Sequence, residues 1–370
     1  MKTVFANTIG SISGRKGALS GKDAFSLCGG NTGNVCFVDA VKEQLACDEE
    51  ISCYKIDCYN DKAVFVLPAS NWINVDGHVL RDIFLPLENK DVQLAVFGLG
   101  VQFGLYDSID DFVIELSKDS NTIRALKILS EHSKYIGIRG NVTGECLDKL
   151  GIHNWKVIGC PSFYEPFRKY GEVKLKECTL DQVIINVTPG KFGEHKVFEY
   201  GIKNKKDIVL QAMQDMPLVL WENRPIEKRH LCKKFPGLEN ITTREAQDYM
   251  KEFGHIFYTR KDWSNFLIEN KVSFSIGSRF HGNMMAFSNG IPALWIIHDV
   301  RTKELVNAMK LPHITYQELL RHSVDEIKDM CNYGREFYDN YCNMGSEYVE
   351  FLNQCNINHN FTEKVSKVGK

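Results

Sequence analysis

The stretch that decides the fold is VSFSIGSRFHGNMMAFSNGIPALWIIHD, residues 272–299. It begins with the apolar run VSFSI, continues into the short helical pattern HGNMMAFSN, and reaches a second apolar run, ALWII, after Gly290 and Pro292. Glycine and proline are common residues just beyond the end of a helix. Apolar runs of this length that alternate with helical stretches are typical of parallel strands in βαβ units. The stretch therefore predicts two neighbouring parallel strands with a helix between them.

The same alternation extends through the rest of the chain. Further short apolar runs are LAVFGLG, YIGIRG, KVIGCP, QVIINVTPG, DIVLQAM, MPLVLW and HIFYT. Strands that alternate with helices predict an α/β fold with a parallel sheet in each half. We expect two Rossmann-like domains, at 1–175 and 176–324, followed by a helical segment and tail at 325–370. The helices within 325–355 are expected to pack back onto the first domain.

Composition limits the classes of function. The 370 residues include 45 lysines and arginines against 47 aspartates and glutamates, a net charge of −2, which gives no indication of general nucleic-acid binding. No apolar run has the length of a membrane span, and the opening residues show no export signal. We therefore expect a cytoplasmic protein with at most peripheral contact at the inner face of the membrane. The 12 cysteines include no C-x-x-C pair, so we expect reduced, buried thiols and no metal site.

Polar residues follow the two apolar runs of the opening stretch. Arg279 and His281 come after VSFSI, and His298, Asp299 and Arg301 come after ALWII. Because the carboxyl ends of neighbouring parallel strands meet at one edge of a sheet, we expect these side chains to lie close together. Ligands of open α/β sheets bind beyond this edge, where helix N-termini favour anions.

Arg139 follows the run YIGI and holds the corresponding position in the first half. Two such edges that face each other would place guanidinium groups on both sides of one ligand. Arginine matches carboxylate and phosphate oxygens, and histidine exchanges a proton near neutral pH. A helix N-terminus disfavours the cationic form of His281, whereas a bound anion favours it. The pattern predicts a site for a small, multiply charged anion; the alternative for Arg139 is an ion pair with Glu145 or Asp148 of the following helix.

The segment SIGSRFHGNMMAFSNGIPALWIIHDVRTKELV closely resembles the signature of the polysaccharide pyruvyltransferase family. That signature is an Arg-x-His-Gly turn, a helix, Gly-x-Pro, a strand and Asp-x-Arg-x-x-Glu-Leu. IGIRGNVTGECLDKLGI with VIGCPSF is similar to the family's mid-chain segment, and GGNTGNV and VFGLG are placed like its N-terminal glycine turns. The resemblance implies two Rossmann-like domains in a GT-B-like fold, with the active site in the interdomain cleft.

The resemblance also implies a reaction. A pyruvyl group would pass from phosphoenolpyruvate, as co-substrate, to a sugar of a capsule, an exopolysaccharide or a polyprenyl-diphosphate-linked precursor. The product is a cyclic pyruvate ketal and phosphate is released, with no other cofactor. By the same resemblance His281 is the general acid, while Arg279, the backbone of Phe280 and Arg139 bind phosphoenolpyruvate.

Five more residues are candidates for supporting roles. Asp299 is either the base for the acceptor hydroxyl or a residue that holds Arg301 and caps the following helix. His298 lies beside it. Asn31 and Asn34 belong to GGNTGNV, which could bind a phosphate at the start of a helix, although the spacing is not that of a nucleotide-binding glycine loop.

Other functions remain open at this point. A nucleotide-sugar glycosyltransferase of the same architecture, such as a sialyltransferase, would use Arg279 and His281 on nucleotide phosphates, and a non-catalytic relative would only bind carbohydrate. Loops at 7–35 and 68–80 are expected to bind the acceptor; galactose and N-acetylmannosamine are suggested by the family alone. The basic segment 222–235 is either a solvated helix face or a contact for lipid pyrophosphate.

Overall fold

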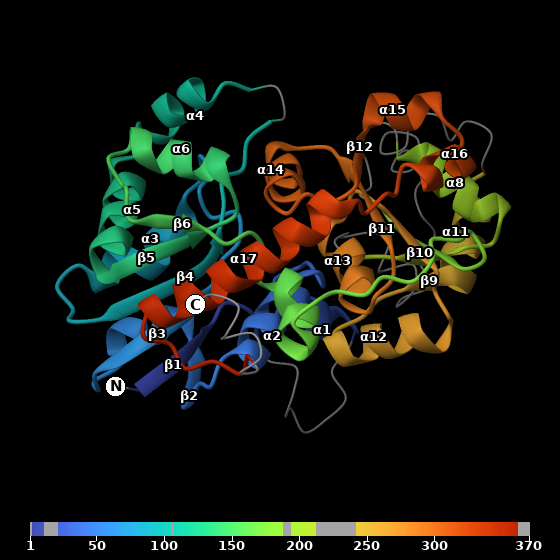
Figure 1. The fold of residues 1–370 in the computed structure, drawn as a ribbon. Coiled ribbons are helices and arrows are strands. Elements are labelled where there is room, and N and C mark those ends of the chain that lie inside the picture. Colours follow the sequence, from blue (N-terminus) through green and yellow to red (C-terminus); the bar gives the residue numbers. More distant parts are fainter. Residues whose placement is uncertain (1, 11–20, 105–106, 188–193, 212–241, 362–370) are drawn as a thin grey trace.

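A computed structural model describes residues 2–10, 21–104, 107–187, 194–211 and 242–361. These residues form two six-stranded parallel sheets, one in each half of the chain (Figure 1). The first sheet has the order β2-β1-β3-β4-β5-β6 and consists of β1 (Lys2–Asn7), β2 (Glu49–Ser52), β3 (Ala63–Pro68), β4 (Gln93–Leu99), β5 (Ser133–Ile138) and β6 (Trp155–Val157). The second has the order β12-β11-β10-β7-β8-β9 and consists of β7 (Val183–Asn186), β8 (Asp207–Val209), β9 (Gly254–His255), β10 (Phe274–Gly277), β11 (Ala293–Ile297) and β12 (His313–Thr315).

Helices connect the strands and cover the sheets. In the first half they are α1 (Gly21–Leu27), α2 (Asn34–Gln44), η1 (Cys53–Cys58), α3 (His78–Phe84), η2 (Leu85–Leu87), α4 (Ile109–Leu116), α5 (Ser120–His132), α6 (Asn141–Lys149), η3 (Pro161–Tyr164) and α7 (Glu165–Tyr170). The second half contains α8 (His195–Lys203), α11 (Thr243–Phe253), α12 (Arg260–Glu269), α13 (Phe280–Ser288), α14 (Val300–Ala308), α15 (Tyr316–Arg321), α16 (Val324–Asp329) and α17 (Arg335–Gln354). The two Rossmann-like units expected from the sequence are confirmed.

The central strands β3 and β4 of the first sheet are apolar on both faces. In β3 every residue from Ala63 to Pro68 is buried, and neighbouring residues belong to different cores. Val64 packs in the core with α2 and α17, while Phe65 packs in the core with α3 and α5. Continuous apolar runs are what a parallel sheet needs when helices cover both faces. Trp72, in the loop 68–80 that is expected to bind the acceptor, is buried against Phe84 in the second of these cores.

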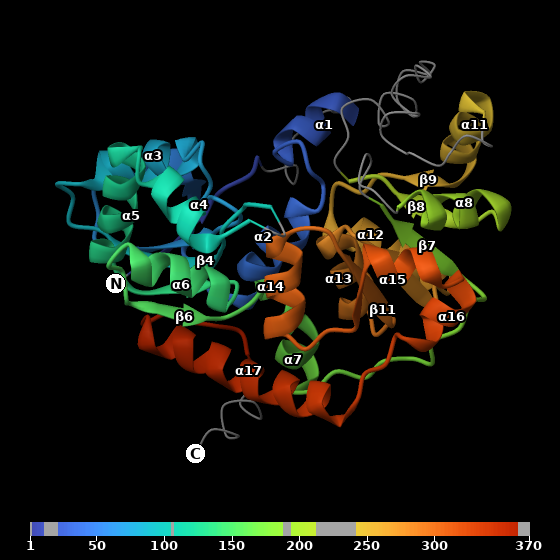
Figure 2. The ribbon, with the colours of Figure 1, turned by 90° about the horizontal axis from the view of Figure 1, so that it is seen from above.

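The last helix returns to the first half (Figure 2). Phe351 of α17 meets Phe97 of β4 with ring centroids 5.4 Å apart, and the Tyr348 hydroxyl donates to Gln44 Oε1 at 2.8 Å. The helical segment expected within 325–355 consists of two helices, because α16 ends at Asp329 and α17 begins at Arg335. In the interruption Tyr333 donates its hydroxyl to Ala293 O at 2.9 Å, and this anchor lets the chain change direction.

Most of the apolar runs contain a strand at the expected place. HIFYT differs, since only its first residue, His255, belongs to β9. The run MPLVLW and the basic segment 222–235 lie outside the described residues. None of the helices in the described ranges is both long and apolar enough to cross a bilayer.

Candidate functional site

The strand ends of the second half bring the predicted residues together. β10 and β11 are hydrogen-bonded neighbours, so the residues that follow them leave the sheet at the same edge. Arg279 is the residue before α13, and Asp299 is the residue before α14. Phe280 opens α13 and is buried, with its carbonyl accepting a hydrogen bond from Trp295 Nε1 at 3.2 Å.

Arg139 enters from the first half, directly after β5. It is buried, its Nε donates to Gly98 O at 2.8 Å, and its guanidinium donates to Asn71 Oδ1. The alternative ion pairs on α6 are not formed, because Asp148 contacts His153 and Glu145 contacts Lys149 instead. Burial, followed by the Arg301 cation, lowers the pKa of Arg139 to about 10. The side chain is therefore still cationic at neutral pH.

The charges of the two halves act on one another. Burial lowers the pKa of His281 well below its usual value, and the cations Arg139 and Arg301 lower it further. Burial also lowers the pKa of Arg279 to about 10, with Arg301 acting in the same direction and Glu194 opposing it. An anion placed among three arginines and a histidine would relieve this repulsion, as expected for a binding site of negative charge.

His281 is held by aromatic rings and a thiol. The Phe37 ring of α2 lies 5.1 Å from the imidazole, and the Phe280 ring lies 5.3 Å from it in an edge-on orientation. Cys160 Sγ is 3.5 Å from Nε2. A Cβ on Gly33, before α2, would lie 3.3 Å from the His281 Cβ, so this glycine allows α2 to approach the imidazole. The imidazole thus lies at the contact between the two halves.

Asp299 is engaged on both sides. Its Oδ1 accepts hydrogen bonds from the Thr302 N–H and hydroxyl at 2.7 Å each, which caps α14. Its Oδ2 lies 3.2 Å from Arg301 Nη2 and 3.2 Å from His298 Nε2. Burial alone would raise the pKa of Asp299, but Arg301 and the bonds from His298 and Thr302 outweigh it and hold the pKa far below the usual range. Of the two alternatives for Asp299, the structure supports the cap and the Arg301 partner.

The glycine-rich turn joins the halves of the chain. Asn31 Oδ1 accepts from Gly33 N at 2.9 Å, and Asn34 Nδ2 donates to Cys28 O at 2.9 Å. The backbone N–H of Thr32 donates to Gln211 O, beyond β8, at 2.8 Å. These atoms of Asn31 and Asn34 shape the turn, and their contact with a ligand stays a prediction.

A buried polar network behind the site was missed in the sequence. Asn186, at the end of β7, donates to Ser275 Oγ at 2.9 Å, and Ser275 donates to Asn283 Oδ1 at 2.7 Å. Gln211 Nε2 donates to Asn186 Oδ1 at 3.2 Å. A Cβ on Gly282 would overlap Asn186 Oδ1, which explains the glycine after His281. In the sequence, the polar Asn186 at the end of the apolar run VIIN is the feature that indicates this network.

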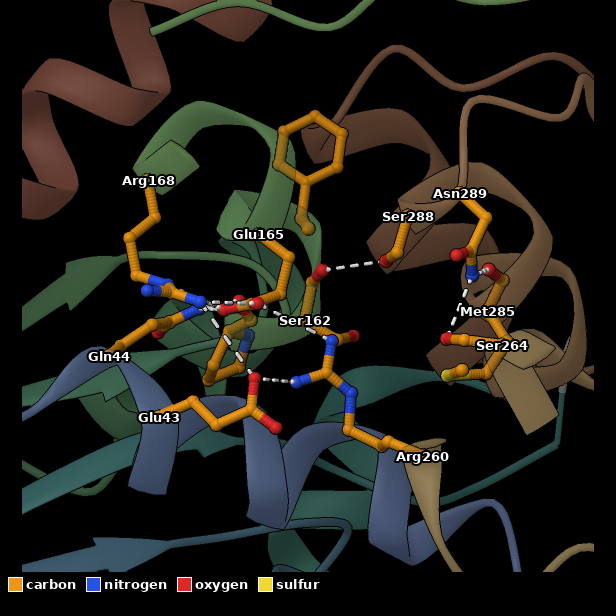
Figure 3. Close-up of polar contacts among 12 residues, drawn as sticks. Glu43, Gln44, Ser162, Glu165, Arg168, Arg260, Ser264, Met285, Ser288 and Asn289 are labelled. Atoms are coloured by element: carbon orange, nitrogen blue, oxygen red, sulfur yellow. Dashed lines mark hydrogen bonds and ion pairs between the residues drawn. The ribbon is translucent and has the colours of Figure 1, made fainter. Parts of the chain in front are cut away.

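A second contact between the halves lies at α2, α7 and α12 (Figure 3). Glu165 is buried and lies 3.1 Å from Arg168 Nη2 and 3.5 Å from Arg260 Nη2. Arg260 also lies 3.0 Å from Glu43 Oε2. Gln44 Nε2 donates to Glu165 Oε1 at 3.0 Å. This ion-pair cluster fixes α12 of the second half against α2 and α7 of the first.

Within the described part of the chain, no group of His, Cys, Asp and Glu has the arrangement of a metal site. The described cysteines are all free thiols, and most of them are buried.

Comparison with known proteins places these features in a wider context. A family model described as polysaccharide pyruvyl transferase matches residues 31–300. The MnaA–UDP co-structure from S. aureus is 11% identical with a TM-score of 0.46, over 96% of this chain and 97% of that one. A UDP-GlcNAc 2-epimerase from Neisseria meningitidis bound to UDP-GlcNAc is 12% identical with a TM-score of 0.40, over 87% and 81%. A functionally uncharacterised protein from Klebsiella pneumoniae is 13% identical with a TM-score of 0.38, over 83% and 87%. No curated protein matches the sequence.

Proposed function

The chain belongs to the polysaccharide pyruvyl transferase family, and from this premise we propose that it uses phosphoenolpyruvate to form a cyclic pyruvate ketal on a sugar. Family membership makes the protein a transferase that acts in pyruvyl transfer to polysaccharide. The donor, the catalytic residues and the ketal are our proposal.

The observation that carries the proposal is the convergence of arginines from both halves on His281. Arg139 and Arg301 lie on opposite halves of the chain, and both lower the pKa of His281. Phosphoenolpyruvate carries a carboxylate and a phosphate on three carbons, so it needs several guanidinium partners in a small space. Arg279 and Arg139 hold these two anionic groups, and Arg301 adds positive charge from beside Asp299.

Binding of the donor prepares His281 for catalysis. The substrate-free imidazole is neutral because burial, Arg139 and Arg301 lower its pKa. The negative charge of phosphoenolpyruvate offsets these cations and favours the imidazolium. The imidazolium then protonates the methylene carbon, and the C=C electron pair forms the new C–H bond. The adjacent carbon becomes cationic and is attacked by a sugar hydroxyl.

The ketal is completed by a second substitution at the same carbon. Phosphate leaves with the C–O electron pair, and a second hydroxyl of the same sugar attacks, releasing its proton. One phosphoenolpyruvate and two hydroxyls thus give one ketal and one phosphate. We place this reaction in the cytoplasm, on an acceptor that is a free glycoside or a polyprenyl-diphosphate-linked sugar.

An acceptor panel tests the proposed function. The purified protein is incubated with phosphoenolpyruvate and with galactosides, N-acetylmannosaminides and their polyprenyl-diphosphate forms, while phosphate release and product mass are followed. The proposal predicts acceptor-dependent phosphate release and a ketal-bearing product, both lost in His281→Ala. Transfer of a glycosyl group from a nucleotide sugar by the same protein, without any reaction of phosphoenolpyruvate, would overturn it.

A further inference from the structure

Cys160 contacts His281 but has no part in the reaction described above. It follows β6 and is buried, and its Sγ lies 3.5 Å from His281 Nε2 and 3.0 Å from Ser162 Oγ. Burial raises the pKa of the Cys160 thiol, so the sulfur is protonated and uncharged at neutral pH. The three groups form a short chain from the imidazole through the thiol to a buried hydroxyl.

The two nitrogens of His281 have different surroundings. Nε2 faces the Cys160 sulfur, and among the described residues this is the hydrogen-bond contact of the imidazole, so Nδ1 has none. His281 as a residue is half-buried, with the Phe37 and Phe280 rings against its imidazole. Nδ1 is therefore the nitrogen left for a hydrogen bond with a bound molecule.

We propose that Cys160 is a positioning residue whose Sγ accepts a hydrogen bond from His281 Nε2–H and thereby makes Nδ1 the atom that exchanges protons with the substrates. The thiol hydrogen is then directed to Ser162 Oγ, so both sulfur contacts are used. In this arrangement the tautomer of the imidazole is fixed by its neighbour, as is usual for functional histidines. The inference rests on the proposed function for its catalytic meaning, but not for the tautomer itself.

The fixed tautomer lets one imidazole act twice. The Nδ1–H bond of the imidazolium breaks as its proton passes to the methylene carbon, and the neutral ring keeps its proton on Nε2, which donates a hydrogen bond to Cys160 Sγ. The bare Nδ1 then accepts the proton of the first attacking hydroxyl, as its O–C bond forms. His281 thus serves as both the acid and the base of the first addition.

Among the residues that the structure describes, no hydrogen bond or ion pair brings a carboxylate base to His281. The charged groups whose fields reach the imidazole are Arg139, after β5, and Arg301, in α14, and both are cations. The carboxylates near these arginines are engaged elsewhere, because Asp299 contacts Arg301 and Glu304 accepts two hydrogen bonds from Thr143. A second role for the imidazole is consistent with this arrangement.

The test compares Cys160→Ala, Cys160→Ser and the control Cys53→Ala, which removes an equally buried thiol from the other core of the first half. Nitrogen-15 NMR of the substrate-free proteins reports the tautomer of His281, with His281→Gln used to assign the signal. We expect an Nε2–H tautomer in the unsubstituted protein, in Cys160→Ser and in Cys53→Ala. In Cys160→Ala we expect a mixture with the Nδ1–H form.

Turnover provides the second readout. Cys160→Ala is expected to lose about tenfold in kcat with little change in the KM for phosphoenolpyruvate, since the lost contact acts on proton transfer. Cys160→Ser should recover most of this loss, and it replaces the alanine variant if that variant does not fold. An Nδ1–H tautomer in the unsubstituted protein, or an unchanged tautomer and kcat in Cys160→Ala, would overturn the inference. Because the tautomer is measured without turnover, failure of pyruvyl transfer itself would count against the proposed function and not against the role of Cys160.

Discussion

Glu304 of α14 accepts two hydrogen bonds from Thr143 of α6, one from the backbone N–H at 2.6 Å and one from the hydroxyl at 2.9 Å. The contact joins the two segments that resemble the family signature. Thr143 follows Arg139 by four residues, and Glu304 follows Arg301 by three. Thr143 also accepts a hydrogen bond from Val101 N at 3.2 Å. Glu304 therefore fixes how the arginine of the first half is placed relative to the arginine of the second.

Removal of this contact should loosen the site and lower stability. In Glu304→Ala the buried Thr143 N–H and hydroxyl lose their partner, which costs about 1–3 kcal/mol for an unsatisfied buried group. We expect a lower free energy of unfolding in urea and weaker binding of phosphoenolpyruvate. Glu304→Gln keeps an acceptor for the Thr143 N–H and serves as the matched control. Equal stability of the alanine variant and the unsubstituted protein would contradict the assignment.

The same pair predicts a pH dependence. Burial raises the pKa of Glu304 above its unfolded value, despite the opposing Thr143 bonds. The folded state thus favours the protonated acid, and this contribution to stability is lost as the pH rises through the folded pKa. Residue 304 does not titrate in Glu304→Gln. The free energy of unfolding of this variant, relative to that of the unsubstituted protein, should therefore increase from pH 4 to pH 7, as the Glu304 carboxyl group of the unsubstituted protein loses its proton. Urea unfolding at both pH values measures the difference; a decrease would be the opposite of what the burial of Glu304 requires.

The ion-pair cluster at α12 should be sensitive to the loss of its central cation. Arg260→Ala removes one of the two arginines that contact the buried Glu165, while Arg168 stays, so the loss should lie below the about 3–5 kcal/mol that breaking an isolated buried pair costs. Lys174→Ala is the control, because it removes an exposed ion pair with Glu172, which water screens and which adds little to stability. Thermal unfolding at neutral pH compares the two. Similar midpoints for both variants would show that the cluster does not hold the halves together.

The glycine after His281 should tolerate no side chain. A methyl group in Gly282→Ala would overlap Asn186 Oδ1, and overpacking of this kind costs about 1–3 kcal/mol. We expect lower stability and loss of activity, because the network under the start of α13 would shift. Gly334→Ala is the control, since nothing lies within 4 Å of the added methyl group. Unchanged activity of Gly282→Ala would show that the polar network around Asn186 does not support the site.

The pH dependence of turnover should differ between free and substrate-bound protein. The pKa of His281 is lowered by burial, Arg139 and Arg301 in the free protein, and bound phosphoenolpyruvate should raise it. Since the protonated form is the acid, kcat/KM should begin to fall with rising pH at a lower pH than kcat does. Profiles of both parameters measure the separation. Coincident limbs would mean that the anion does not control the protonation of His281.

Local pattern was sufficient to predict the fold and the principal candidates for the site. Apolar runs identified the strands, and polar residues just after two of these runs identified Arg139 and Arg279. This was possible because the end of a strand can be located from the residues next to it in the sequence. The neighbours of His281 could not be predicted in this way. Cys160 and Phe37 are brought to the imidazole by packing between segments far apart in the sequence, and no periodicity reports that packing.

The C-terminal helix shows the same limit. Its apolar spacing predicted a helix but not the interruption before Arg335. Within the interruption Tyr333 contacts Ala293, which is 40 residues away in the sequence. Likewise, Glu304 was part of a recognisable motif, yet its partner Thr143 became evident only in the folded chain.

Arginines from both halves of the chain should bind phosphoenolpyruvate together, and calorimetric titration measures this binding. We expect the unsubstituted protein to bind phosphoenolpyruvate. Arg139→Met and Arg279→Met should each weaken binding by about tenfold or more, as expected for loss of a hydrogen bond to a charged group. Binding of a nucleotide sugar in place of phosphoenolpyruvate, or phosphoenolpyruvate affinity unchanged in both variants, would contradict it.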